Sequence, residues 1–152
     1  MRRKDKEITD KSLIESILQK SKVCRIGLSR DNEPYIVPVI FAYEENCIYF
    51  HSAHAGKKID ILQQNSRVCV EIDELNDVVA GKKACLFGLR YISIIGFGKA
   101  SFITDLDEKS AALNLLMRKY TNQTEWTYYP AALEKMNLIK IELDKLTGKE
   151  SK

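Results

Sequence analysis

What the sequence lacks excludes several classes of protein. No apolar run approaches the ~18 residues that a membrane-spanning helix requires, so we expect no membrane partner. The opening segment MRRKDKEITD has no apolar stretch behind its charges and does not match a secretory signal peptide; we expect a cytoplasmic protein. The net charge is only +3 and no basic stripe is interleaved with aromatic residues, so we expect no nucleic-acid partner.

Familiar site motifs are also missing. The chain has neither the G-x-x-x-x-G-K-[ST] loop nor the G-x-G-x-x-G turn of nucleotide-binding proteins. Its four cysteines include no C-x-x-C pair, which removes the usual zinc-knuckle and redox motifs. Its two histidines are followed by no further ligands at a regular spacing, so we expect no metal site.

The composition is that of a globular protein with an ordinary core. Hydrophobic residues make up 45% of the chain and charged residues 30%, and the length of 152 fits a single domain over residues 1–152. Three cysteines, Cys24, Cys47 and Cys69, lie in apolar, strand-like segments. We expect them to be buried, reduced thiols, because an unpaired cysteine behaves as a small hydrophobic residue.

The order of periodic segments predicts a mainly β protein. In the first half we expect a helix at 10–20, capped by Thr9 or Asp10, and a second helix at 55–65. Between them we expect a meander of three strands, at 23–28, 34–43 and 47–52, joined by the polar turns RDNE and EEN. In the second half we expect a strand at 67–73, a loop without periodicity at 74–83, and one or two strands at 84–104. A helix that starts at Asp105 follows at 105–120, then an aromatic loop at 121–130 and a last strand at 138–143. Strands dominate, so we expect a small antiparallel barrel or sandwich with helices packed outside.

Three residues interrupt the strand pattern. Pro38 lacks an N–H, so its position is an edge, a bulge or a place where the backbone meets something other than a strand. Gly96 and Gly98 alternate within one strand, which indicates a bulge, strong bending, or close approach of another backbone or a ligand.

The segment IYFHSAHAGKKIDIL at 48–62 changes from strand to helix and gathers polar groups at the corner. The start of a helix offers unpaired N–H groups and a partial positive charge, and Ser52, Gly56, Lys57 and Lys58 add a hydroxyl, space and two full charges. This combination suits a phosphate monoester. A solvated helix start capped by Ser52 explains the same residues.

Four stretches that run in order between residues 24 and 121 carry a family resemblance: RIGLSRDNEPYIVPVIFAY, IYFHSAHAGKKIDILQQNSRVCVEID, ACLFGLRYISIIGFGKASFI and DEKSAALNLLMRKYT. Together they resemble the FMN-binding split-barrel superfamily. Within these pyridoxamine 5'-phosphate oxidase-like proteins, the sequence is most similar to the nitroimidazole-resistance branch. The resemblance implies a six-stranded antiparallel Greek-key split β-barrel with peripheral helices. It also implies a homodimer that holds FMN at the subunit interface.

The resemblance assigns roles to individual residues. It places the backbone of the strand at 34–43 along the isoalloxazine ring and the strand-to-helix corner at 52–58 against the phosphate. It also brings the segment at 91–98 of the partner subunit near the cofactor. The cofactor-binding residues are then Val37, Pro38, Val39, Ile40, His51, Ser52, His54, Gly56, Lys57, Lys58, Ser93 and Ile94. His51 is the match for a functional histidine near the flavin, with His54 three residues away as the alternative, and the aromatic loop 126–129 is expected to line the open side of the ring.

The implied function is an FMN-dependent oxidoreductase that passes electrons from NAD(P)H to a small acceptor, with a nitroimidazole-type nitro group as a candidate. A flavin- or haem-binding module without turnover and a pyridoxamine 5'-phosphate oxidase-type enzyme are the alternatives. The chain departs from the nitroimidazole-resistance pattern at Leu86, Phe87 and Ile92, and the loop expected at 74–83 has no counterpart in it.

Overall fold

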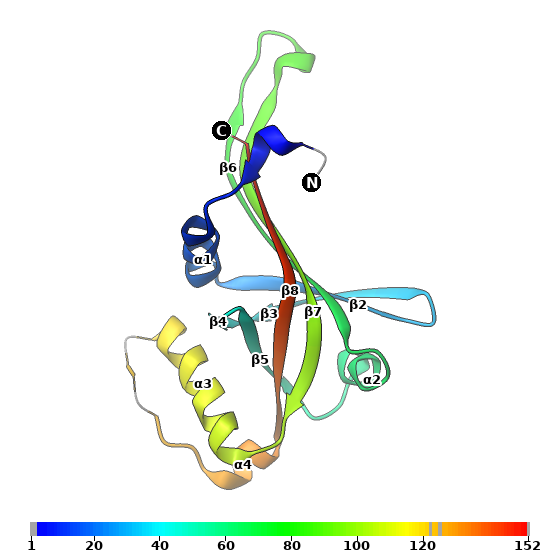
Figure 1. Cartoon of the computed structure of the whole chain (residues 1–152), viewed down its shortest axis with the longest axis vertical. Coiled ribbons are helices and arrows are strands. Elements are labelled where there is room, and N and C mark those ends of the chain that lie inside the picture. Colours follow the sequence, from blue (N-terminus) through cyan, green and yellow to red (C-terminus); the bar gives the residue numbers. More distant parts are fainter. Residues whose placement is uncertain (1–2, 122, 125, 152) are drawn as a thin grey trace.

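A strongly bent antiparallel sheet forms the body of the protein, and its helices lie on the outside (Figure 1). The computed structural model describes residues 3–121, 123–124 and 126–151. In chain order the elements are η1 (Lys4–Lys6), β1 (Glu7–Ile8), α1 (Lys11–Lys20), β2 (Val23–Arg30), β3 (Glu33–Ile40), β4 (Ala42–Glu44), β5 (Cys47–Ala53), α2 (Lys57–Gln64), β6 (Arg67–Val79), η2 (Ala84–Leu86), β7 (Gly88–Ile103), α3 (Leu106–Tyr120), α4 (Pro130–Glu134) and β8 (Met136–Ser151).

The strands follow the order β3-β2-β6-β7-β8-β5-β4, and β1 pairs with β8. Only Phe41 separates β3 from β4, so the chain bends there from one end of the sheet to the other. No pairing among the described strands joins β3 to β4, and the barrel therefore stays split. The prediction of an antiparallel split barrel with peripheral helices is confirmed. Eight strands are present rather than six, because the bent strand counts as β3 and β4 and the short β1 adds one more.

Tyr120, the last residue of α3, secures the bend. Its hydroxyl accepts a hydrogen bond from the Phe41 amide at 3.1 Å and lies within hydrogen-bond distance of the carbonyl oxygens of Phe41 and Lys22. Phe41 is fully buried, so its backbone groups need partners inside the protein. Burial in turn raises the pKa of the Tyr120 phenol, which keeps it a neutral hydrogen-bonding group.

The two predicted turns are confirmed as two-residue hairpin turns. Asp31 and Asn32 have φ values of 52° and 62°, and Glu45 and Asn46 have 48° and 64°. Two successive residues in the left-handed region define the turn type that matches the twist of paired strands. Asn and Asp tolerate this region better than most side chains do, so local chemistry fixes both hairpins.

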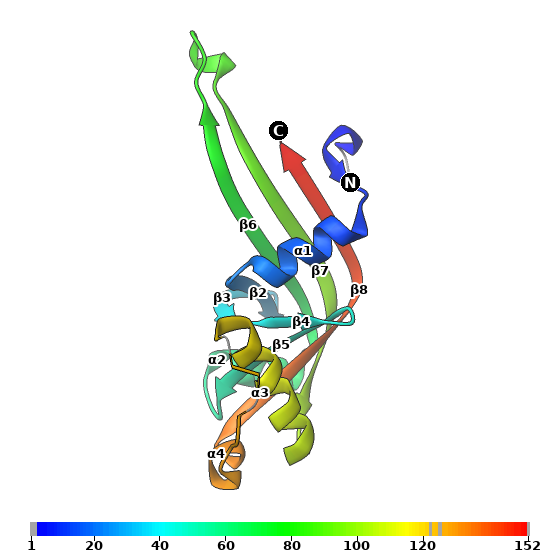
Figure 2. The same ribbon diagram turned by 90° about the vertical axis from the view of Figure 1, so that its left-hand side faces the viewer.

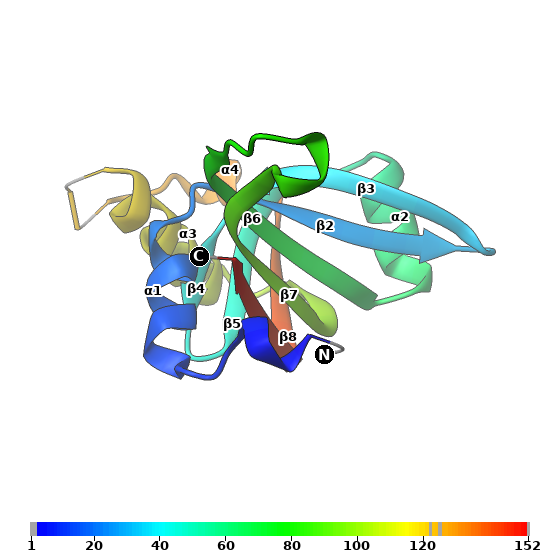
Figure 3. The same cartoon turned by 90° about the horizontal axis from the view of Figure 1, so that it is seen from above.

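α1 and α3 begin where the sequence predicts, and α2 begins at Lys57, two residues after its expected start. The Asp10 carboxylate accepts the amide of Ser12 at 2.9 Å, and the Asp105 carboxylate accepts those of Asp107 and Glu108 at 3.0 and 2.9 Å. Seen from above, α1 and α3 lie on one side of the sheet and α2 on the other, beside β2 and β3 (Figure 3). Of the helices in the described ranges, none is both long and apolar enough to cross a bilayer.

The core has two parts. Inside the barrel, alternate residues of the strands meet the buried faces of α1 and α2; Phe41, Phe50, Ile26, Ile72 and Ile141 are among its fully buried members. A smaller cluster beneath α3 and α4 includes Leu113, Leu116, Leu133 and Leu138. Lys109, also buried, donates to the carbonyl oxygens of Leu133 and Met136 at 2.9 and 3.0 Å and so ties α3 to the start of β8.

The prediction of a loop at 74–83 is wrong for residues 74–79, whereas residues 80–83 do form a loop. β6 continues to Val79 and pairs with the start of β7, so residues 75–90 form a two-stranded hairpin, here called the arm, which projects beyond the rest of the molecule (Figures 1 and 2). The strand expected from 84 begins only at Gly88, after η2. Neither face of the arm is buried, so polar residues occur on both faces. The alternation of apolar and polar residues that would predict a strand is therefore absent.

The last strand is also longer than predicted. The alternation expected for 138–143 ends because β8 carries a bulge: Gly98 pairs with Leu143 and Phe97 with Lys145, which leaves Asp144 unpaired. Before the bulge the odd-numbered residues Ile141 and Leu143 are buried, and after it the even-numbered Gly148 is buried, so the inward-facing positions change at the bulge. A pattern with one constant period therefore ends at residue 143 although the strand continues to Ser151.

The cysteines differ from the expectation in part. All four are free, and Cys24 is fully buried, which raises the pKa of its thiol to about 12. Cys47 and Cys69 are only half-buried, because their side chains lie on the outward face of β5 and β6. The prediction of three buried thiols is therefore wrong for these two; residues on either side of each occupy the inward face instead.

Gly98 lies beside the bulge, where the backbone of β8 comes close to β7. A Cβ built on Gly98 would fall far inside the contact distance of the Glu142 carbonyl oxygen and 3.0 Å from the Glu142 carbonyl carbon. Backbone atoms cannot yield as a flexible side chain can, so only glycine fits beside the bulge.

We expect Gly98→Ala to lower the free energy of unfolding by about 1–3 kcal/mol, the usual cost of forcing an extra carbon into a packed site. Gly88→Ala is the matched control, since its Cβ would meet only Val79 at an ordinary 3.7 Å. Urea unfolding followed by circular dichroism measures both. Equal stability of the two variants contradicts this account of the bulge.

Candidate functional site

The corner between β5 and α2 contains a buried hydroxyl without a partner. Ser52 is only 5% exposed, and its Oγ makes no hydrogen bond to any described residue. A buried hydroxyl that stays unpaired costs stability, so such a group often marks a place for a ligand. The sequence-based alternative, in which Ser52 caps α2, does not hold, because α2 receives no side-chain cap from the described residues.

The start of α2 presents free backbone donors to open space. Gly56 precedes the helix with φ of 134°, a conformation that other residues rarely adopt, and nothing lies within 4 Å of the place where its Cβ would be. The amides of Ile59 and Asp60 bond to the Gly56 carbonyl oxygen at 2.8 and 3.1 Å. The amides of Lys57 and Lys58 lie before the first bonded amide of the helix and remain available for an anion.

The two lysines of this first turn have different surroundings. The Lys57 ammonium donates to Glu33 at 2.7 Å and lies 5.1 Å from the centre of the Tyr35 ring, so it joins α2 to β3. This hydrogen bond lowers the pKa of the Glu33 carboxyl. Lys58 is half-buried and has no acidic partner in the described part of the chain. Lys58 is therefore the cation that is free to meet a bound anion.

Contacts from the end of the chain hold the corner in place. Asn137 of β8 donates its side-chain amide to the carbonyl oxygens of Ala53 and His54, at 3.2 and 3.1 Å. The His54 Nε2 contacts the carbonyl oxygen of Glu134, at the end of α4. The structure thus places His54 in a bond to the protein backbone, beside the corner rather than in its opening.

His51 lies on the opposite face of β5 from Ser52. Its side chain is exposed, whereas Ser52 and Phe50 are buried in the barrel. On one side β5 pairs with β8 throughout, but its pairing with β4 stops at Tyr49, so the edge at 51–53 is unpaired on the other side. A group that contacts both His51 and Ser52 must therefore lie along this free edge.

β3 provides a second free edge. It ends the strand order, so Pro38 lies in an edge strand, and the β2–β3 register runs without a bulge. Of the predicted contacts, Val39 is buried, Val37 is half-buried, and Pro38 and Ile40 are exposed. The free edges of β3 and β5 border the split of the barrel, and the Lys57–Glu33 ion pair joins α2 to β3 at the far end of β3 from the Phe41 bend.

The predicted contacts from the aromatic loop and from β7 lie elsewhere in the chain. Ser93 is opposite Lys149 in β8, whereas Ser52 is opposite Asn137, which is roughly 40 Å of strand away. Ile94 is 1% exposed and its side chain belongs to the core of its own chain. One chain therefore does not bring Ser93 to the corner. Trp126 and Tyr129 are exposed, with Tyr129 directly before α4.

A hollow of about 510 Å³ lies away from the corner, between α1 and the β4–β5 turn; it is lined by Lys11, Ile14, Glu15, Tyr43, Glu45, Asn46 and Leu146. It contains none of the predicted site residues. The corner itself opens to solvent, since Ala53, His54, Ala55 and Gly56 are all exposed.

Sequence reasoning missed two residues that shape the corner. Glu33 lies in the polar segment taken as a turn, and its role depends on the distance between β3 and α2 in space. Asn137 begins the last strand, and only the pairing of β5 with β8 brings it to Ala53. Neither contact is local in sequence, so no spacing signal marks them.

Comparisons with known proteins show the family and the fold. The sequence model of the family described as pyridoxamine 5'-phosphate oxidase matches residues 10–150. A solved structure from Bacteroides thetaiotaomicron, of a candidate 5-nitroimidazole antibiotic resistance protein, is 35% identical to this chain and has a TM-score of 0.85; the match covers 95% of this chain and 86% of that one.

More distant relatives share the fold or a short segment. The FAD and heme binding protein of Mycobacterium smegmatis has a TM-score of 0.88 at 20% identity, over 97% of this chain and 74% of its own, which shows the fold alone. An uncharacterised Rhizobium meliloti protein is 33% identical over 60 residues, so the match spans 40% of this chain and 39% of that relative. With the family pattern extending over residues 10–150, the chain belongs to the pyridoxamine 5'-phosphate oxidase family, as its resemblance implied.

Proposed function

We propose that the protein is an FMN-binding oxidoreductase that works as a homodimer with the cofactor at the subunit interface. Electrons pass from NADH or NADPH through the flavin to a small acceptor, and a nitro group of the nitroimidazole type is the leading candidate. The family and the relative from Bacteroides thetaiotaomicron support the class of reaction. The β5–α2 corner supports the cofactor.

The observation that carries this proposal is the unpartnered Ser52 hydroxyl beside the uncapped start of α2. A phosphate monoester satisfies the hydroxyl, the amides of Lys57 and Lys58, and the free ammonium of Lys58 together. FMN ends in such a group. FAD, which the Mycobacterium smegmatis relative binds according to its description, presents a diphosphate instead, and the mass of the cofactor released on denaturation separates the two.

The remaining residues position and protect the ring. The backbone of β3 at 37–40 has unpaired groups along its free edge, and these can bond to the polar edge of a flavin. To His51, which is exposed beside the free edge of β5, we assign the role of donating a proton to the acceptor or orienting it. When bound, the flavin supplies the redox chemistry, and the protein supplies orientation, hydrogen bonds and exclusion of water.

The corner can be tested through cofactor affinity. We expect Lys58→Ala to weaken FMN binding at least tenfold, because it removes a charge-assisted contact, and Ser52→Ala to weaken it several-fold. Lys20→Ala, an exposed lysine at the end of α1, is the matched control and should leave the affinity unchanged. Fluorescence titration of flavin-free protein gives the dissociation constants. Wild-type affinity in both corner variants rules out this phosphate site.

The reaction can be tested by anaerobic spectroscopy. We expect NADH or NADPH to bleach the bound flavin, and a nitroimidazole to restore its absorbance. His51→Ala should slow the second step about tenfold or more while the flavin stays bound, and His54→Ala should leave it near the wild-type rate, because His54 contacts the backbone of Glu134.

A flavin that no nicotinamide bleaches leaves the protein a binding module and removes the oxidoreductase proposal. A Soret band in the purified protein, in place of flavin absorbance, favours haem as the ligand. Turnover of pyridoxamine 5'-phosphate in place of the nitro compound favours the oxidase after which the family is named.

A further inference from the structure

Tyr91, the residue of β7 that directly follows the arm, is surrounded by ammonium groups. The Lys6 and Lys149 ammoniums lie 5.8 and 5.1 Å from the centre of its ring. Lys6 also donates to the Ser151 hydroxyl at 2.8 Å, and Ser151 is the residue opposite Tyr91 in β8. All four residues are half-buried. Both ends of the chain and β7 thus build one group of side chains, here called the Tyr91 cluster.

Neither lysine of the Tyr91 cluster forms an ion pair with any residue that the structure describes. The Asp5 carboxylate is bonded to Arg3 at 2.7 Å instead. The carboxylates of this region line a neighbouring hollow of about 340 Å³, to which the Tyr91 ring does not contribute: Asp5, Glu7 and Glu150. A hydrogen bond from Lys149 and the charges of Lys149, Lys6 and Arg3 lower the pKa of the Tyr91 phenol. The electrostatic potential at the phenol is therefore positive.

Other ammonium groups that lie over aromatic rings have acceptors in the protein. Lys57 bonds to the Glu33 carboxylate. Lys22 and Lys119 each donate to a backbone carbonyl oxygen. Lys149 has no acceptor in the described ranges apart from the phenol of the cluster. Its ammonium shares one ring with a second ammonium, so the two repel each other, and an anion bound between them would remove this repulsion.

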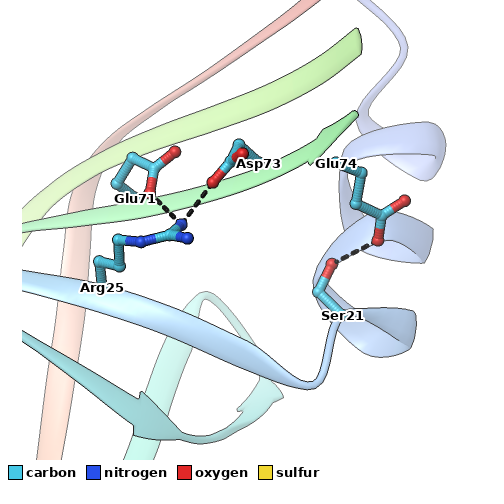
Figure 4. A network of polar contacts seen from close by, with 5 residues as sticks. All are labelled: Ser21, Arg25, Glu71, Asp73 and Glu74. Atoms are coloured by element: carbon cyan, nitrogen blue, oxygen red, sulfur yellow. Dashed lines mark hydrogen bonds and ion pairs between the residues drawn. The ribbon is translucent and has the colours of Figure 1, made fainter. Parts of the chain in front are cut away.

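The other side of β7 carries charge of the opposite sign. Arg25 bonds to Glu71 at 3.0 Å and also to Asp73 (Figure 4). Asp73 is opposite Ser93 in β6, and Lys149 is opposite Ser93 in β8. Two carboxylates thus share one guanidinium on the β6 side of Ser93, whereas the β8 side presents an ammonium without an ion pair. An anion beside Ser93 is therefore directed towards β8 and the Tyr91 cluster.

The position of the Tyr91 cluster connects it with the cofactor of the proposed function. That proposal brings the segment at 91–98 of the partner subunit near the flavin. Tyr91 and Ser93 lie on the same face of β7, about 7 Å apart along the strand. The β5–α2 corner already provides for the phosphate of FMN. A further anion site beside the cofactor therefore suits a second phosphate group, one that belongs to a substrate.

We propose that the Tyr91 cluster binds the 2'-phosphate of NADPH and so selects NADPH over NADH as the electron donor. The inference rests on the proposed function, which supplies the flavin and the nicotinamide donor. NADPH differs from NADH by one phosphate monoester on the adenosine ribose. The two ammoniums bind oxygens of this group, and the phenol, which accepts from Lys149, donates its proton to a third oxygen. NADH leaves both ammoniums without a counter-charge.

Recognition of the phosphate is tested by isothermal titration calorimetry of the purified protein with 2',5'-ADP and 5'-AMP, which differ only by the 2'-phosphate. We expect 2',5'-ADP to bind at least tenfold more tightly than 5'-AMP. Lys6→Ala/Lys149→Ala should abolish this difference, and Tyr91→Phe should reduce it several-fold. The matched control Lys99→Ala/Lys145→Ala removes two exposed lysines of β7 and β8 and should preserve it. Circular dichroism verifies that every variant folds.

Selection of the donor is tested by anaerobic stopped-flow reduction of the bound flavin. We expect the second-order rate constant of the wild type to be at least tenfold higher with NADPH than with NADH. Lys6→Ala/Lys149→Ala should lower this ratio to about one, because the phosphate then gains no charge-assisted contact. Lys149→Glu should bring the ratio below one, since its carboxylate repels the phosphate.

Equal affinity of the wild type for 2',5'-ADP and 5'-AMP overturns the proposal, and so does a preference that Lys6→Ala/Lys149→Ala retains. Inorganic phosphate that binds as tightly as 2',5'-ADP also overturns it, because the cluster then recognises the free anion and no nucleotide. If 2',5'-ADP binds through the two lysines but no nicotinamide bleaches the flavin, the phosphate site stands and only the proposed oxidoreductase activity fails. If NADH and NADPH bleach the flavin equally well, the proposed function stands and only the role of the Tyr91 cluster fails.

Discussion

The bend at Phe41 determines where the two free strand edges lie. One residue takes the chain from β3, at one end of the strand order, to β4 at the other, and the Tyr120 hydroxyl satisfies the backbone groups that the bend leaves without a neighbouring strand. Without such a partner a buried, unpaired backbone would oppose the bend. With it, β3 and the end of β5 diverge, and the split between them stays open beside the start of α2.

Local chemistry in the sequence was enough to predict most of the elements. Asp10 and Asp105 cap their helices, the left-handed turn residues fix two hairpins, and the corner was recognised from the order of its residues. What the sequence could not provide is contact between distant segments. The extension of β6 beyond Asp73 depends on pairing with β7, and the bulge at Asp144 reverses the alternation that a single period assumes.

The candidate site shows the same division. Ser52, Gly56 and Lys58 follow from one continuous segment, whereas the partners that fix their geometry, Glu33 and Asn137, come from strands on either side of it. Alternation along β5 also places His51 and Ser52 on opposite faces, a fact that adjacency in the sequence conceals. Of the residues assigned by resemblance, 37–40 lie on the free edge of β3 and His51 and Ser52 lie beside the free edge of β5, whereas Ser93 and Ile94 lie far from both edges in one chain.

Along the arm, β6 and β7 pair only with each other, and this allows the length of the hairpin to vary. Since its strands bond only to each other beyond Tyr91, a pair of residues can be added or removed there without shifting the register of any other strand pair. No residue of the corner touches the arm. The length and composition of this hairpin can therefore change without altering any contact that holds the corner within one chain.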